Sequence, residues 1–126
     1  MNILGIGLDA TDIPRVAELI DKYGARFLQR VFTPGEIAYC TKRRNSAPHF
    51  AGRFAVKEAA MKALGTGQSQ GVVWRDIEVV RVGGPPRLAL HGGAARRAET
   101  MKVRSSLVTI THSESLAMAQ VLLLGD

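Results

Sequence analysis

The stretch from about residue 49 to residue 64 constrains the fold more than any other part of the chain. Its alanine-rich run from Phe54 to Leu64 contains no glycine or proline, and Gly65-Thr66-Gly67 follows directly. This composition predicts a long helix with a glycine stop. Beyond it the apolar pattern changes period, because residues 77–82 are rich in β-branched side chains and predict a strand. The chain therefore changes from helical to strand signals at its middle.

Helix signals also dominate the N-terminal third. Asp12 is positioned to cap a helix with an amphipathic stripe over residues 13–20, and Gly24 is a plausible stop. Thr33-Pro34-Gly35-Glu36 forms a capping box that predicts a helix to about Lys42. Further elements are predicted as strands at 3–8, 87–91, 106–111 and 116–124, a helix at about 92–101, and turns at 83–86 and 112–115. We expect an α+β fold, an antiparallel sheet packed with helices, in one domain covering residues 1–126.

Charge narrows the range of partners. Lys and Arg number 17 against 11 Asp and Glu, which gives a formal net charge of +6. This balance suits nucleic acid, an anionic membrane surface, an acidic protein or a phosphorylated small molecule. Only 6% of the residues are aromatic, and they do not alternate with basic residues as a base-stacking platform requires. A small basic nucleic-acid-binding domain is therefore a disfavoured alternative.

Cysteine use and hydropathy indicate the compartment. Cys40 is the one cysteine, so it cannot form an internal disulfide, and we expect it to be an inert packing residue. The longest apolar run, residues 121–124, is far shorter than the ~20 residues that a membrane span needs. We expect a soluble cytoplasmic protein with no membrane partner.

Asp9 is the first candidate for chemistry. It follows a strand that contains Gly5 and Gly7, and it precedes a helix. A carboxylate there can reach a cation or a phosphate-bound metal, and the alternative is an Asx turn that joins strand to helix. Ala10 occupies the place of the third glycine in a dinucleotide fingerprint, so a dinucleotide-binding fold is disfavoured.

Glu58 and Lys62 are the second candidate site. They are four residues apart on the long helix and share one face, which fits either an exposed salt bridge or a magnesium–phosphate site. Asp9 and Glu58 together provide about the number of carboxylates that Mg²⁺ takes from a protein. The three histidines are scattered without the spacing of a zinc site.

One family carries four such segments in this order and spacing. They are Gly5-Ile-Gly-Leu-Asp9 with Arg15, Phe32-Thr-Pro-x-Glu36, the block from Arg53 to Gly67, and His112-Ser113 followed by Ala117-x-Ala119. From Ile3 to about Leu123 the sequence resembles the holo-(acyl-carrier-protein) synthases, the short type of 4′-phosphopantetheinyl transferase. The most specific part is Lys57-Glu58-Ala-x-x-Lys62-Ala with its upstream Asp9.

The resemblance implies a Mg²⁺-dependent reaction, with Mn²⁺ as an alternative. The 4′-phosphopantetheine group of coenzyme A would pass to a serine of an apo acyl carrier protein, leaving adenosine 3′,5′-bisphosphate. Asp9 and Glu58 would bind the metal against the pyrophosphate. One of them, or a water held by the metal, would take the serine proton, and Lys62 would stabilise the leaving phosphate.

The resemblance also implies supporting contacts. Those to coenzyme A would come from Arg53, Gly65, Pro86, His112 and the basic cluster with Lys42, Arg43 and Arg44. Arg15 would meet the acidic recognition helix of the carrier protein, with Arg26 and Arg30 as additions. For the coenzyme A residues, a solvated surface charge or a plain turn is the alternative.

Short members of the family imply a homotrimer with each site completed at a subunit interface, where Asp9 faces the pocket of a neighbouring chain. A homologue that binds without catalysing is a further alternative, although Asp9, Glu58 and Lys62 are all present. The type of carrier, whether fatty-acid, polyketide or peptide, stays open.

Overall fold

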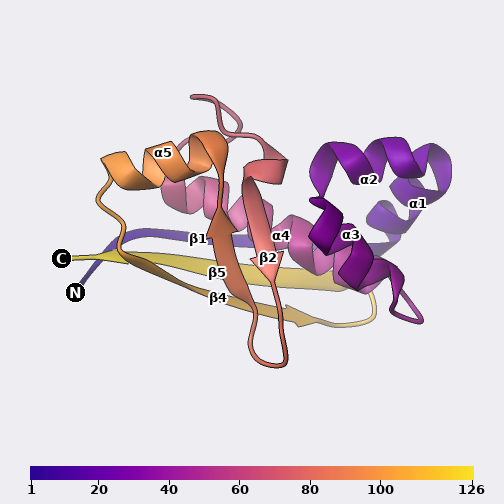
Figure 1. Ribbon diagram of the computed structural model, residues 1–126. Helices are drawn as coiled ribbons and strands as arrows, with labels where there is room; N and C mark the ends of the chain where they lie inside the picture. The colour runs from indigo at the N-terminus through magenta and orange to yellow at the C-terminus, as the bar shows by residue number, and fades with distance from the viewer.

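The long alanine-rich helix lies at the centre of the molecule (Figure 1). In the computed structural model, which describes all 126 residues, this helix is α4 and spans Ala47–Leu64. Twelve of its 18 residues are buried, so the helix is enclosed on nearly every side. Gly65 adopts a left-handed φ of 74° and ends the helix, which confirms the predicted glycine stop.

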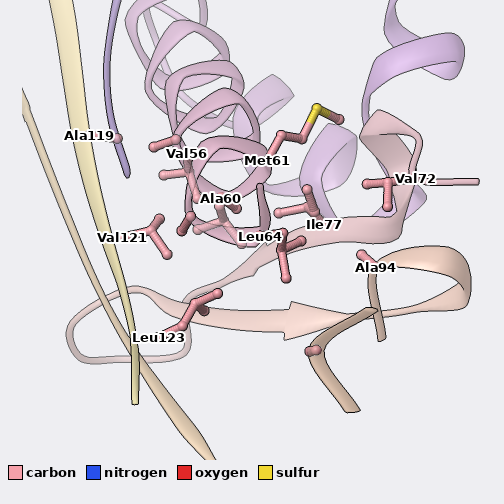
Figure 2. Close-up of a cluster of buried hydrophobic side chains, with 14 of the residues drawn as sticks. Val56, Ala60, Met61, Leu64, Val72, Ile77, Ala94, Ala119, Val121 and Leu123 are labelled. Atoms are coloured by element: carbon pink, nitrogen blue, oxygen red, sulfur yellow. The ribbon is translucent and has the colours of Figure 1, made fainter. Parts of the chain in front are cut away.

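A three-stranded antiparallel sheet packs against α4 in the order β1-β5-β4. Its strands are β1 (Asn2–Asp12), β4 (Ser105–His112) and β5 (Leu116–Gly125). Every second residue of β5 is buried, from Ala117 to Leu123. Figure 2 shows Val121 and Leu123 in one cluster with Val56 and Leu64 of α4. The predicted α+β class with an antiparallel sheet is confirmed.

The strand boundaries differ from the prediction by one to four residues, and two of these differences affect candidate site residues. β1 runs through Asp9 to Asp12, because its hydrogen-bonded register with β5 continues to the pair Asp12–Leu116. His112 is the last residue of β4, paired with Ala117, and does not belong to the turn. Asp9 therefore lies inside a strand and not in an Asx turn.

Gly5 and Gly7 determine how closely β1 approaches α4. A Cβ atom on either would collide with the backbone carbonyl group of Ala63 or Ala59, respectively. Both glycines lie on the same face of β1 as Asp9, because alternate residues of a strand share a face. The glycines thus let strand and helix meet backbone to backbone, and Asp9 follows on the face turned toward α4.

The middle of the chain forms a hairpin that crosses the sheet (Figure 1). A single 3-10 turn at Trp74–Asp76 leads into β2 (Ile77–Val80), which pairs with β3 (Arg87–Leu90). The helix α5 spans Gly92–Thr100. Ile77 and Val72 join the α4 cluster in Figure 2, so this region closes the main core.

Three short helices form the other end of the molecule: α1 (Ile13–Tyr23), α2 (Ala25–Val31) and α3 (Pro34–Thr41). They enclose a second core in which the rings of Phe32 and Phe50 lie 4.9 Å apart. The predicted capping box is confirmed, whereas Asp12 makes no side-chain cap hydrogen bond. The sequence did not predict α2. Cys40 is fully buried here, and burial raises the pKa of its thiol to about 11, as an inert packing residue requires.

The face of the sheet opposite α4 carries no helix (Figure 1). Four apolar side chains of this face are 36–58% exposed: Ile6, Leu8, Leu107 and Met118. They come from all three strands, so they form a surface and not isolated residues. None of the helices is both long and apolar enough to cross a bilayer.

Candidate active site

Asp9 meets Lys62 across the close contact of β1 and α4. Lys62 Nζ donates to Asp9 Oδ1 at 3.1 Å and to the Leu8 carbonyl oxygen at 2.9 Å. Thr11 Oγ1 donates to the other oxygen, Asp9 Oδ2, at 3.2 Å. Both oxygens of this carboxylate are therefore oriented by the same chain. The Asp9 side chain is only 18% exposed, whereas that of Lys62 is 57% exposed.

Glu58 completes a group of three charged side chains. Lys62 pairs with Asp9 and not with Glu58, so the salt bridge that the spacing suggested does not form. Burial raises the pKa of Glu58, and the negative charge of Asp9 raises it further. The indole of Trp74 and the ammonium of Lys62 act in the opposite direction. Asp9 and Glu58 therefore lie close enough to repel each other within one chain.

The chemistry of these donors fits a magnesium ion. The chain has no group of three or more His, Cys, Asp or Glu residues that could hold a metal alone. A cation between Asp9 and Glu58 would take its remaining ligands from water and from substrate oxygens. Mg²⁺ binds in this way, with one or two protein carboxylates and phosphate oxygens.

Arg53 forms a second cationic site on α4. Its side chain is buried, with 4% of the residue exposed, and its Nε has no hydrogen-bond partner. Nη1 donates to the carbonyl oxygen of His49 at 3.4 Å, and no carboxylate pairs with this guanidinium. A buried cation without a counterion is costly, so the site is suited to receive an anion.

Tyr39 joins Arg53 to a cavity. The guanidinium carbons of Arg43 and Arg53 lie 4.0 and 4.1 Å from the centre of the Tyr39 ring. Burial acts to raise the pKa of Tyr39, but contact with Arg43 and the charges of Arg53 and Arg81 lower it overall. A positive potential thus surrounds the ring. Tyr39, Lys42 and Arg43 line a cavity of about 830 Å³ between α3 and the β2–β3 hairpin.

The structure gathers only some of the predicted coenzyme A residues. Lys42 lines the cavity, Arg53 stacks on its wall residue Tyr39, and the His112 ring lies 6.4 Å from that of His49. Arg44 is exposed and does not line the cavity, and Pro86 lines a different hollow beside α5. Gly65 forms the C-cap of α4 at the far end of that helix.

Arg15 lies beside an apolar groove. It is exposed on α1, four residues before Leu19, so the two share one face of the helix. Leu19 is the first of the residues that line the groove, of about 530 Å³: Leu19, Tyr23, Arg26, Phe27, Arg30, Val31, Phe54 and Trp74. Arg26 and Arg30 thus add positive charge to its walls, and Phe54 extends it to α4.

A model of the 4′-phosphopantetheinyl transferase superfamily matches residues 5–120, which include Asp9, Glu58 and Lys62. The chain belongs to this superfamily. A holo-(acyl-carrier-protein) synthase of Koribacter versatilis is 48% identical, covering 96% of this chain and 98% of the relative. One from Methylobacterium sp. (strain 4-46) is 50% identical over 96% of this chain and 93% of the relative.

Solved structures show the same fold. A holo-(acyl-carrier-protein) synthase from Neisseria meningitidis matches with a TM-score of 0.89 at 28% identity, covering 98% of this chain and 99% of the other. One from Helicobacter pylori, in complex with coenzyme A, gives 0.83 at 28% identity, with 94% and 99% covered. The chain is therefore an enzyme, a phosphopantetheinyl transferase of the holo-(acyl-carrier-protein) synthase type.

Sequence reasoning missed three features of this transferase. Lys57 is fully buried and donates to Glu36 Oε1 at 2.6 Å and to the carbonyl oxygens of Trp74 and Ile77. Glu36 also accepts from the backbone of Thr33 and Val79, so the capping glutamate fixes α3, α4 and β2 together. Tyr39 and Trp74 are the other two. In the sequence, the capping box marks Glu36 and the family motif marks Lys57. Neither signal predicts that these two side chains form a buried ion pair with each other.

Proposed function

We propose that this transferase moves 4′-phosphopantetheine from coenzyme A to a serine of an apo acyl carrier protein, with Mg²⁺ and with adenosine 3′,5′-bisphosphate as the second product. The convergence of Asp9, Glu58 and Lys62 at the contact of β1 and α4 carries this proposal. Phosphoryl transfer needs aligned reactants and neutralised charge more than covalent help from the protein. Two carboxylates beside one exposed ammonium group provide both.

Asp9 and Glu58 would hold the Mg²⁺, and Mn²⁺ would serve in its place. When bound, the metal supplies charge neutralisation at the pyrophosphate of coenzyme A. Thr11 and Lys62 already orient the Asp9 carboxylate in the chain alone. The proposed ligand therefore needs little reorganisation before it binds.

The proton and the leaving group involve different side chains. The serine oxygen attacks the β-phosphorus of coenzyme A, and the bond from that phosphorus to the oxygen bridging to the α-phosphate breaks. One of the two carboxylates, Asp9 or Glu58, would take the serine proton. The Lys62 side chain is 57% exposed, so its ammonium group can reach the leaving phosphate. It would stabilise the negative charge that develops there.

The unpaired cation Arg53 supports binding of the remaining phosphate of coenzyme A. Its guanidinium is buried without a counterion, and Lys42 and Arg43 extend the positive charge to the cavity. His112, next to His49, completes this candidate subsite. We assign supporting coenzyme A contacts to Arg44, Gly65 and Pro86 as well, on the family resemblance alone. The Helicobacter pylori relative was solved with coenzyme A, as was one from Bacillus anthracis with a TM-score of 0.80.

Arg15 and the apolar groove form the candidate docking surface for the carrier protein. Positive charge from Arg15, Arg26 and Arg30 would attract an acidic helix, and the apolar walls between α1 and Phe54 would receive its hydrophobic side chains. Trp74 is one of the residues that line the groove, and its indole also interacts with Glu58. A docked carrier would thus have its serine delivered toward the carboxylates.

A homotrimer remains part of the proposal. The open face of the sheet, with Ile6, Leu8, Leu107 and Met118, is the surface that a second and third chain would cover. Each site would be completed at a subunit interface, where Asp9, which meets Lys62 of its own chain, would face the pocket of a neighbouring chain.

Transfer to the carrier is the direct test. The protein is incubated with coenzyme A, Mg²⁺ and apo acyl carrier protein, and the carrier is weighed by mass spectrometry. We expect a mass gain of one phosphopantetheine, lost on adding a chelator and almost lost in Glu58→Gln. Asp126→Asn, an exposed change beyond β5, is the matched control and should transfer normally. Near-normal turnover by Glu58→Gln, or no transfer to any of several carriers, would contradict the proposal.

A further inference from the structure

Trp74 connects the docking groove to the reaction centre, and this inference rests on the proposed function. Its ring packs against Phe54 with ring centres 5.9 Å apart, and its carbonyl oxygen accepts from Lys57 Nζ at 3.2 Å. Phe54 and Glu58 are four residues apart on α4 and so share one face of the helix. The indole therefore lies along the helix face that carries Glu58.

The indole nitrogen is a buried donor without a partner. Trp74 Nε1 is inaccessible to solvent, yet it makes no hydrogen bond of normal geometry. Buried polar groups in folded proteins are nearly always paired, so an unpaired donor calls for an acceptor that completes it. The indole packs against Phe54, and Glu58 is the acidic residue one turn further along the same face of α4, so its carboxylate is the candidate acceptor. Asp76, two residues after Trp74 in the chain, already accepts from the backbone of Val73.

We propose that Trp74 Nε1 donates a hydrogen bond to the ionised Glu58 carboxylate and orients it for the transfer reaction. Trp74 is then a positioning residue, since it acts on the substrates through Glu58. Hydrogen bonds from outside the metal ligands typically fix the orientation of those ligands in this way.

The same ring also forms one wall of the groove with Phe54. A carrier protein bound there would press on the residue that holds Glu58. The docking surface and the carboxylate are therefore joined by one rigid aromatic side chain, with no intervening loop.

Nuclear magnetic resonance can test the bond directly, because the chain has one tryptophan. A proton–nitrogen correlation spectrum of the ¹⁵N-labelled protein shows a single indole cross-peak. We expect this proton to move upfield in Glu58→Ala, and the backbone peaks far from α4 report that the fold is kept. If Glu58→Ala fails to fold, Glu58→Gln serves, because its amide oxygen accepts a weaker hydrogen bond. An unchanged indole shift would overturn the proposal.

Kinetics separates positioning from packing. Trp74→Phe keeps an aromatic wall beside Phe54 and removes only the N–H, so we expect kcat to fall about tenfold with an unchanged KM for the carrier. Val73→Ala, an exposed neighbour outside the groove, is the control and should keep both constants. An unchanged kcat in Trp74→Phe, or a lower kcat accompanied by a higher KM for the carrier, would overturn the positioning role of Trp74. The spectral comparison needs no substrate, so it can fail while the unmodified protein still transfers phosphopantetheine, which distinguishes this inference from the proposed function.

Discussion

Two lysines on α4 form ion pairs that differ in almost every physical respect. Lys57 pairs with Glu36 at 2.6 Å, and neither side chain has any exposed surface. Lys62 pairs with Asp9 at 3.1 Å, and the two side chains are 57% and 18% exposed. The buried pair is enclosed by four further polar backbone groups, whereas the Lys62 ammonium can leave its partner for a substrate. Burial thus separates a lysine that holds the fold from one that can act in chemistry.

Replacing Lys57 should have the largest effect on stability. Lys57→Met leaves the Glu36 carboxylate buried without a cation, and we expect a loss of about 3–5 kcal/mol in the free energy of unfolding. Lys62→Met is the matched variant and should change it by less than about 1 kcal/mol, because its pair is partly exposed. Urea unfolding followed by circular dichroism measures both. Equal losses in the two variants would break the contrast between the pairs.

The reverse contrast should appear in catalysis. Lys62→Ala removes the ammonium proposed to stabilise the leaving phosphate, and we expect kcat to fall about 10²–10³-fold in a folded protein. Lys62→Arg keeps the charge and should recover part of the rate. A discontinuous assay of holo carrier protein by mass spectrometry gives the rates. Full activity in Lys62→Ala would mean that this pair, like the buried one, has only a structural role.

Arg15 extends the comparison to an exposed charge with no partner carboxylate. Arg15→Glu should raise the KM for the carrier protein several-fold and leave the KM for coenzyme A nearly unchanged. Added salt should reduce the difference in carrier KM between this variant and the unmodified protein. Arg96→Glu on α5 makes the same charge change at an exposed position away from the groove. Steady-state kinetics with each substrate varied in turn is the measurement. Equal changes in both KM values would argue against a docking role.

The smallest effect concerns the half-buried Glu58. Burial raises its pKa above the ordinary value of 4.5, so the folded chain holds this proton more tightly than the unfolded chain. The contribution of Glu58 to the free energy of unfolding is therefore fully present below its pKa in the unfolded chain. It is lost as the pH rises through its pKa in the folded chain. Glu58→Gln should therefore melt slightly higher than the unmodified protein at neutral pH, with the difference vanishing in acid. A lower melting temperature at neutral pH would show that the ionised carboxylate stabilises the fold.

Local signals in the sequence predicted most of the elements. The capping box at Thr33 and the glycine stop at Gly65 use contacts within one or two turns, so a single segment contains the information. The seven-residue helix α2 was missed because it starts directly after Gly24, which was interpreted only as a stop. Its stability comes from contacts with α1 and the 3-10 turn at Trp74, which no local pattern records.

The candidate site was partly predictable for the same reason. Motif spacing predicted Asp9, Glu58 and Lys62 as site residues, but it did not predict that Lys62 pairs with Asp9, because the two are far apart in the sequence. The roles of Gly5 and Gly7 could not be predicted from the sequence, because they depend on the close approach of β1 to the backbone of α4. Burial decides which charge is structural, and a local sequence does not contain it.

The position of β5 at the middle of the sheet has a consequence for biosynthesis. β1 contains Asp9 and is translated before the other helices and strands of this domain, yet its only partner strand, β5, is translated after all of them. Until residues 116–125 are available, the strand that carries Asp9 has no hydrogen-bonded neighbour to fix it against α4. Pairing between such distant segments is slow to form. The nascent chain is thus expected to stay inactive until β5 has been synthesised, because only then can β1 hold Asp9 beside α4.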